Sequence, residues 1–88
     1  MVRNLRTPGH LALMQVLVET RKAKNVTQQE LADRLDRPQS FVAKVETGER
    51  RLDVVELAEW VIAVDVEYQV VMDTVLVAVR ATQVDPAG

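Results

Sequence analysis

The middle of the sequence is dominated by closely spaced helix start and stop signals. Thr27 is a favourable N-cap residue, and Glu30 three positions later completes the capping-box pattern, so a helix should begin at about Gln28. That helix is expected to end at 36–38, because Pro38 is disfavoured inside a helix but is tolerated in the first turn of the next one. The pattern predicts two short helices joined by a turn of three or four residues.

The second short helix is predicted over 39–46, with Gly48 closing it. Phe41, Val42 and Val45 are its expected inward anchors. Its outward face holds the polar or small residues Gln39, Ser40, Ala43, Lys44 and Thr47. A longer amphipathic helix over 10–24 should precede the pair, because its apolar residues recur at helical spacing.

A fourth helix should follow Asp53, which can cap it. Apolar residues recur there at three- and four-residue spacing, namely Val54, Leu57, Ala58, Val61 and Ile62. Trp60 lies off that stripe, so we interpret it as a partly covered core or interface residue.

The segment 66–79 is rich in valine, whose branched side chain lowers helix propensity and favours strands. We favour a helix, because an isolated strand would leave its backbone groups unpaired unless a second chain supplied a partner. As a helix it presents a seam of large side chains, made of Tyr68, Val71, Met72, Val75 and Val79. A domain of this size cannot easily cover all these valines, so the seam is a candidate dimerisation surface.

The net charge of −2 conceals two oppositely charged parts of the chain. Residues 1–52 have a balance of +4 and residues 53–88 one of −6. A basic part suggests a polyanionic partner, while the acidic part should face elsewhere. No signal-peptide apolar region is recognisable at the N-terminus, and carboxylates interrupt the apolar run 54–79, so we expect a cytoplasmic protein with no membrane span.

Several kinds of chemistry are disfavoured by residue content. The 88 residues allow one domain, and they include no cysteine and a single histidine, His10, so neither a thiolate zinc site nor a metal cluster is expected. Ser40 has no histidine base near it in sequence, and the three glycines form no phosphate-binding loop. We therefore expect no enzyme activity, no cofactor and no metal.

The stretch 26–35 followed by 37–49 resembles the helix-turn-helix of the phage-repressor/Cro-like (XRE) family. The resemblance covers about residues 10–63, and its most specific part is the combination of Gln28, Leu31-Ala32, Val42 and Glu46-x-Gly48. It implies an all-α, five-helix, lambda-repressor-like fold. The implied divisions are a flexible segment 1–9, a DNA-binding domain 10–63, a dimerisation tail 64–82 packed on the same core, and a flexible end 83–88.

The resemblance also implies roles for individual residues. Gln39, Ser40 and Lys44 match the positions that read bases in the major groove, and Arg21 and Glu46 match a buried ion pair. Contacts to the DNA backbone are expected from Thr27, Gln28, Arg37, Thr47, Arg50 and Arg51, the three arginines on charge and placement alone. Asn25 and Asp36 stand where the family commonly has glycine, but both residue types reach left-handed conformations more readily than most.

Two functions are compatible with this pattern. The first is a sequence-specific transcriptional regulator of double-stranded DNA, a dimeric repressor that reads a palindromic operator. The alternative is an antitoxin-type protein whose acidic part, 53–88, binds and neutralises a second protein, while its helix-turn-helix regulates its own operon.

Overall fold

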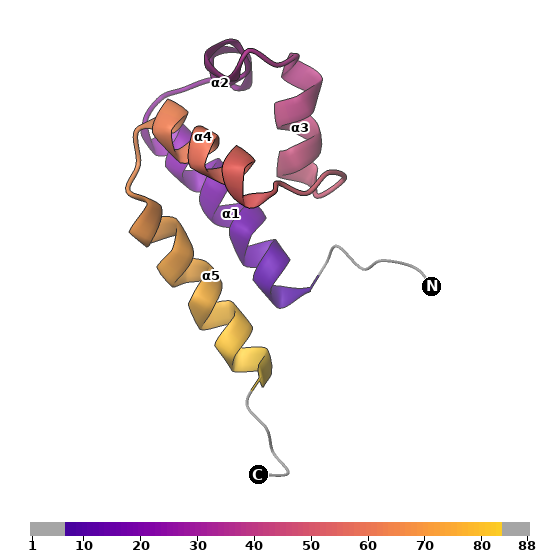
Figure 1. Cartoon of the computed structure of the whole chain (residues 1–88), viewed down its shortest axis with the longest axis vertical. Coiled ribbons are helices and arrows are strands. Elements are labelled where there is room, and N and C mark those ends of the chain that lie inside the picture. Colours follow the sequence, from indigo (N-terminus) through magenta and orange to yellow (C-terminus); the bar gives the residue numbers. More distant parts are fainter. Residues whose placement is uncertain (1–6, 84–88) are drawn as a thin grey trace.

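The computed structural model describes residues 7–83, and every regular element in that range is a helix (Figure 1). The helices are α1 (Pro8–Ala23), α2 (Gln28–Leu35), α3 (Gln39–Thr47), α4 (Val54–Val64) and α5 (Tyr68–Gln83). The predicted five-helix, all-α architecture is confirmed, and the valine-rich tail is a helix, not a strand. Within 7–83, no helix is both long enough and apolar enough to cross a membrane.

The first helix begins earlier than the sequence analysis expected. Thr7 is its N-cap and accepts a hydrogen bond from the backbone N–H of His10 at 3.2 Å, while Pro8 occupies its first turn. Residues 7–9 therefore form the N-cap and the first turn of α1, so the predicted flexible segment 1–9 is wrong for its last three residues. The rest of that segment, 1–6, and residues 84–88 of the predicted flexible end lie outside the described residues.

Local signals set the ends of the other helices. Thr27 with Glu30 and Asp53 with Glu56 form complete capping boxes, in which each pair satisfies two backbone N–H groups. Asn25 and Asp36 have φ values of 58° and 55°, so both adopt the left-handed conformation expected of them in place of glycine.

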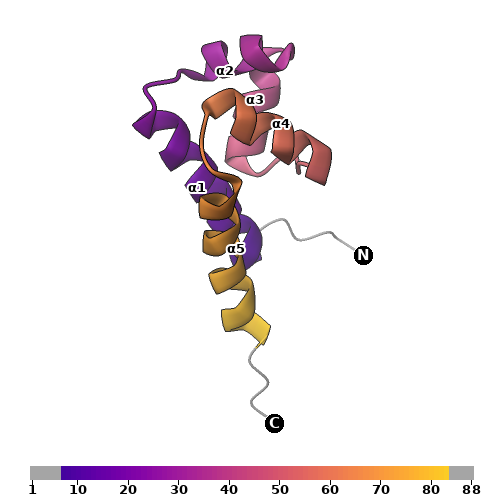
Figure 2. The same ribbon diagram turned by 60° about the vertical axis from the view of Figure 1, so that its left-hand side comes forward.

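The helices form two groups along an elongated molecule of 47 × 31 × 20 Å. Figure 2 shows α2, α3 and α4 gathered towards one end, while α5 lies beside α1 and continues along the long axis. The core is centred where α1, α2, α3 and α4 meet, and α5 extends it. Its largest fully buried side chains are Leu17, Leu31, Val42, Trp60, Val64 and Val71.

The orientation of α4 differs from the one that its apolar spacing predicted. Trp60 is completely buried, whereas Val54 and Ile62 of the predicted stripe are 81% and 76% exposed. A tryptophan ring removes more apolar surface from water than a valine or isoleucine does, so the rotation that buries Trp60 is favoured. The ring packs against Phe41 of α3, with a centroid distance of 6.4 Å.

The predicted dimerisation seam on α5 mostly faces α1 instead. Val71 is completely buried in the core of its own chain, so its expected role in a dimer interface is wrong. Val79 lies against Gly9, where an added Cβ would come within 2.6 Å of Val79 Cγ2. The seam is covered because α1 has its own apolar face to bury, and α5 is the element that lies along it. Tyr68 remains half exposed.

Candidate nucleic-acid interface

The turn between α2 and α3 is held by backbone hydrogen bonds and one small side chain. The N–H of Asp36 reaches back to the carbonyl of Asp33 at 3.2 Å, and that of Arg37 to the carbonyl of Ala32 at 2.9 Å. Ala32 is completely buried. A larger side chain in this closely packed position would force its neighbours apart. The two helices are thus locked in a helix-turn-helix.

A buried ion pair ties α1 to the end of α3, as the family resemblance implied. The guanidinium of Arg21 donates from Nε to Glu46 Oε2 at 2.6 Å and from Nη2 to Glu46 Oε1 at 3.0 Å. Its Nη1 donates to the carbonyl of Val26 at 2.8 Å. Both side chains are almost fully buried, and the bidentate pair together with the third bond uses one N–H on each of the three guanidinium nitrogens.

The same carboxylate begins a hydrogen-bonded chain that reaches the molecular surface. Glu46 Oε1 also accepts a hydrogen bond from Gln28 Nε2 at 2.8 Å. Gln28 Oε1 in turn accepts from Gln39 Nε2 at 2.7 Å. The side chain at the exposed start of α3 is therefore oriented, through Gln28, by an ion pair in the core.

The three residues expected to read bases lie on one helix and are all exposed. Gln39, Ser40 and Lys44 project from α3. Ser40 and Lys44 also line a shallow surface hollow of about 410 Å³, together with Arg50. The polar groups of α3 that the sequence singled out thus lie together on one surface.

The two threonines expected to contact the DNA backbone already use their hydroxyls within the chain. The hydroxyl oxygen of Thr27 accepts from the N–H of Glu30 at 3.0 Å as part of the capping box. The backbone N–H of Thr27 donates to Glu30 Oε1 at 2.8 Å, and this bond lowers the pKa of the Glu30 carboxyl. The hydroxyl of Thr47 lies 3.1 Å from Glu49 Oε2, to which it can donate. Both side chains are exposed at the ends of their helices.

Two of the expected phosphate-binding arginines share a carboxylate that the sequence analysis did not assign. Arg50 binds Glu56 through both terminal nitrogens at 2.9 and 2.8 Å, and Arg37 Nη2 lies 3.1 Å from Glu56 Oε2. The guanidinium carbon of Arg37 lies 4.4 Å from the centroid of the Phe41 ring, and that of Arg50 lies 4.8 Å from it. Hydrogen bonds from Arg50 and from the Asp53 backbone lower the pKa of Glu56 to about 2.

The capping spacing between Asp53 and Glu56 was the only sequence signal for this cluster. It indicates a helix start, but it does not predict that the same carboxylate binds arginines from two other segments. The positive charge of Arg37 and Arg50 is therefore partly compensated, which was not expected from charge counting.

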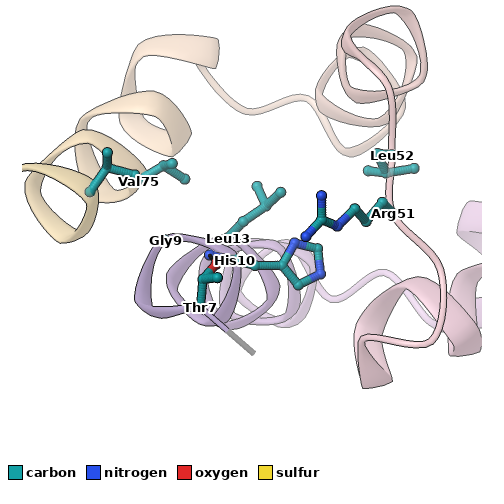
Figure 3. Close-up of a pocket in the computed structure, with 8 residues that line it drawn as sticks. Thr7, Gly9, His10, Leu13, Arg51, Leu52 and Val75 are labelled. Atoms are coloured by element: carbon teal, nitrogen blue, oxygen red, sulfur yellow. Dashed lines mark hydrogen bonds between the residues drawn. The ribbon is translucent and has the colours of Figure 1, made fainter. Parts of the chain in front are cut away.

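Arg51 is placed differently from its neighbour. It lines an open pocket of about 320 Å³ between the start of α1 and α5, with His10 and Leu13 on one side and Val75 on another (Figure 3). Burial lowers the pKa of His10, and the positive charge of Arg51 adds to that effect. Within residues 7–83, no group of three or more potential ligand residues could hold a metal ion.

These features define a helix-turn-helix DNA-binding domain, and comparison with known proteins agrees. A helix-turn-helix family model matches residues 17–70, which include α2, α3 and α4. The chain belongs to the XRE-type helix-turn-helix family, whose members are DNA-binding transcription regulators.

Among solved structures, the chain is similar to an XRE-family like protein from Pseudomonas syringae pv. tomato str. DC3000. The two are 40% identical with a TM-score of 0.74, over 78% of this chain and 84% of that chain. No curated protein matches the sequence.

Proposed function

We propose that this protein is a cytoplasmic, dimeric repressor that recognises a palindromic operator through the outward face of α3. The observation that carries the proposal is the chain of hydrogen bonds from Arg21 through Glu46 and Gln28 to Gln39. A surface glutamine with no function would gain little from such support. A base-reading glutamine needs it, because base recognition depends on a defined orientation of the amide.

The bond to Gln28 leaves Gln39 able to read adenine. A glutamine amide has two N–H donors and one carbonyl oxygen, and Gln28 uses a single N–H. The remaining N–H and the oxygen match N7 and N6 of adenine in the major groove. Lys44 can donate to the acceptors of guanine, and Ser40 is compatible with several bases.

Contacts to phosphate would hold α3 in register. The N-terminus of α2, with Thr27 and Gln28, offers backbone and side-chain donors, as helix starts commonly do for phosphate. Thr47 and Arg51 are further proposed contacts. Arg37 and Arg50 would contribute less than their charge suggests, because Glu56 binds both.

The direct test is selection of bound sequences from random duplex DNA, followed by binding measurements on the selected sequence. Lys44→Ala should weaken specific binding by about 1–3 kcal/mol and relax the preference at one base position. Lys22→Ala, which changes an exposed lysine on α1, is the matched control and should leave the base preference unchanged. If wild-type protein selects no sequence at low salt, the repressor proposal is wrong.

The antitoxin alternative is favoured by one observation on α4. Val54, Val55 and Ile62 are all strongly exposed. Asp53 and Glu59 beside them in the chain are acidic, while Arg34 of α2 lines one surface hollow with Ile62. An exposed apolar strip of this kind is a typical protein-binding surface. Copurification of a stoichiometric basic protein from the native host, lost in Ile62→Glu, would support this function. A wild-type protein isolated alone from the same host would argue against it.

A further inference from the structure

A surface pocket shares no lining residue with the outward face of α3 or with the exposed apolar strip of α4. It has a volume of about 320 Å³ and lies between the start of α1, the loop 48–53 and α5 (Figure 3). Small-molecule sites in proteins usually measure about 300–1,000 Å³, so this pocket has room for a compact ligand only. His10 and Arg51 form its polar end. Its apolar wall is formed by Leu13, Leu52, Val75 and Val79.

The polar end of the pocket is positively charged. Figure 3 shows the guanidinium of Arg51 extending towards the ring of His10. Of the described residues, the eight that line the pocket include no carboxylate. The pocket also lies at the first turn of α1, which contains no acidic residue and whose N-terminal end carries a partial positive charge. The pocket therefore offers a cationic end to an anion.

The imidazole of His10 is incompletely satisfied within the chain. Its Nε2 atom is buried, and no described residue forms a hydrogen bond with it. Burial and the charge of Arg51 both lower the pKa of the imidazole, so the ring is neutral at neutral pH. An unpartnered buried polar atom costs free energy, and such atoms are rare in native structures. An anion bound beside the ring would offset the effect of Arg51.

We infer that this pocket binds a small organic monocarboxylate with a compact apolar body, such as an aromatic or branched aliphatic acid. The carboxylate lies against Arg51, with His10 beside it. A guanidinium has five N–H donors in a planar fork, so Arg51 can pair with a carboxylate in addition to its contacts within the chain. The apolar body lies against Leu13, Leu52 and Val75, where it is removed from water.

Other ligand classes fit the pocket less well. A neutral apolar compound would cover the guanidinium of Arg51 without giving it a partner. A polyphosphate carries several charges, and the apolar wall would leave most of them without donors. A single negative charge joined to an apolar group matches both ends of the pocket.

Ligand binding at this site would be linked to DNA binding through Arg51. This consequence rests on the proposed function, in which Arg51 contacts a phosphate. A carboxylate that pairs with Arg51 competes with that phosphate, so the ligand should weaken binding to all DNA sequences alike. The pocket itself does not depend on the DNA-binding proposal.

Nuclear magnetic resonance of His10 tests the inference directly, because His10 is the single histidine of the chain. Benzoate is the probe, acetate lacks its apolar body, and benzamide lacks its charge. At constant ionic strength, benzoate should raise the pKa of His10 saturably, with a dissociation constant of about 1–10 mM. Acetate should bind about tenfold more weakly or worse, and benzamide should leave the pKa unchanged. No saturable effect of benzoate, or equal effects of benzoate and acetate, would overturn the inference.

Two variants test whether the ligand lies in this pocket. Arg51→Gln removes the charge at an exposed position, and Val75→Phe fills the apolar wall. Each should weaken benzoate binding by about tenfold or more. Arg80→Gln and Val77→Phe make the same changes at exposed positions of α5 outside the pocket and should bind benzoate as wild type does. Circular dichroism establishes which variants are folded. Undiminished benzoate binding in Arg51→Gln, or in a folded Val75→Phe, would overturn the inference.

Operator binding with and without benzoate separates this inference from the proposed function. At matched ionic strength, saturating benzoate should weaken DNA binding by wild type about three- to tenfold and should not affect that of Arg51→Gln. If the protein binds benzoate but no DNA, the repressor function fails and the pocket stands. If it binds DNA but not benzoate, the pocket inference fails and DNA recognition stands.

Discussion

Gln28 is the residue on which the proposed DNA-reading surface most depends, although it is only half exposed itself. It accepts from Gln39 with its carbonyl oxygen and donates to Glu46 with its amide nitrogen. A glutamine is suited to this position because it supplies a donor and an acceptor on one rigid group. The side chain of its neighbour Gln29 forms a local hydrogen bond to Asp33, one helical turn away.

Replacing Gln28 by alanine should therefore affect recognition more than folding. We expect Gln28→Ala to lower the free energy of unfolding by about 1 kcal/mol, since Glu46 keeps its bonds to Arg21. Binding to the selected operator should weaken by about 1–2 kcal/mol, with a relaxed preference at the base read by Gln39. Fluorescence anisotropy on matched and substituted duplexes measures both effects. Gln29→Ala is the control, and equal losses in the two variants would refute the bracing role.

Glu56 is the second residue with a role beyond its local structure. It caps α4 through the backbone of Asp53 and binds Arg37 and Arg50 at the same time. Its pKa in the folded protein is about 2, below the ordinary value of 4.5. Between these two pH values the folded state binds fewer protons than the unfolded state. Its contribution to stability is thus complete above about pH 4.5 and is lost as the pH falls towards 2.

The lowered pKa of Glu56 predicts that the unfolding free energies of wild type and Glu56→Gln depend differently on pH. Glutamine keeps an oxygen that can cap Asp53 but carries no charge, so the variant should be less stable at pH 7. The difference between the two proteins should shrink steadily from pH 4.5 to pH 2. Urea unfolding at four pH values across this range measures it. A difference that stays constant with pH would show that the charge on Glu56 contributes nothing.

At the scale of helices, the close approach of α1 and α5 depends on Gly9. The position lies in the first turn of α1, where it faces Val79. At an ordinary helical position, alanine is more stabilising than glycine by roughly 0.5–1 kcal/mol. Here the added methyl group would lie 2.6 Å from Val79 Cγ2, and the branched valine has few alternative rotamers in a helix.

We therefore expect the opposite sign from Gly9→Ala. The variant should lose about 1–3 kcal/mol of unfolding free energy, because the two helices must move apart or Val79 must leave its rotamer. In a Val79→Ala background, where the clashing methyl groups are absent, Gly9→Ala should cost less unfolding free energy than it does in wild type. Chemical denaturation measures all three proteins. A Gly9→Ala variant more stable than wild type would show that the contact adapts without cost.

At the scale of the whole molecule, the division of charge is less simple than the sequence suggests. The basic part carries +4, but its Arg37 and Arg50 bind Glu56, a carboxylate that belongs to the acidic part. The two parts are therefore linked electrostatically where Arg37 and Arg50, from the segments before and after α3, bind Glu56 in the first turn of α4. The positive charge available to attract DNA is therefore smaller than the formal charge of residues 1–52.

The salt dependence of DNA binding should report this compensation. The slope of log affinity against log salt changes by about 0.9 for each phosphate that the protein neutralises. Glu56→Gln should release Arg37 and Arg50, steepen the slope by up to about two and raise affinity for unrelated DNA. Glu59→Gln removes an equal charge from an exposed site on α4 and should change the slope far less. Identical slopes in the two variants would contradict the compensation.

The helix-turn-helix and the ends of its helices follow from local signals in the amino-acid sequence. Thr27, Asp36 and Gly48 act through their own backbone and immediate neighbours, so the information needed to place them is local. The all-α class, the exposed face of α3 and the pairing of Arg21 with Glu46 could be predicted because the family pattern and the apolar spacing of α3 agree.

Which faces of α4 and α5 are covered depends instead on the packing of the helices against one another. Both helices carry apolar side chains around most of their circumference, so their periodicity does not select one face. Trp60 was expected to be only partly covered and Val71 to lie in a dimer interface, but both are completely buried. The rotation of each helix is chosen by what it packs against, which for α5 is α1. The pairing of Glu56 with Arg50 and Arg37, which lie 6 and 19 positions earlier in the chain, likewise depends on how these segments meet in space. The spacing of the residues in the sequence does not predict it.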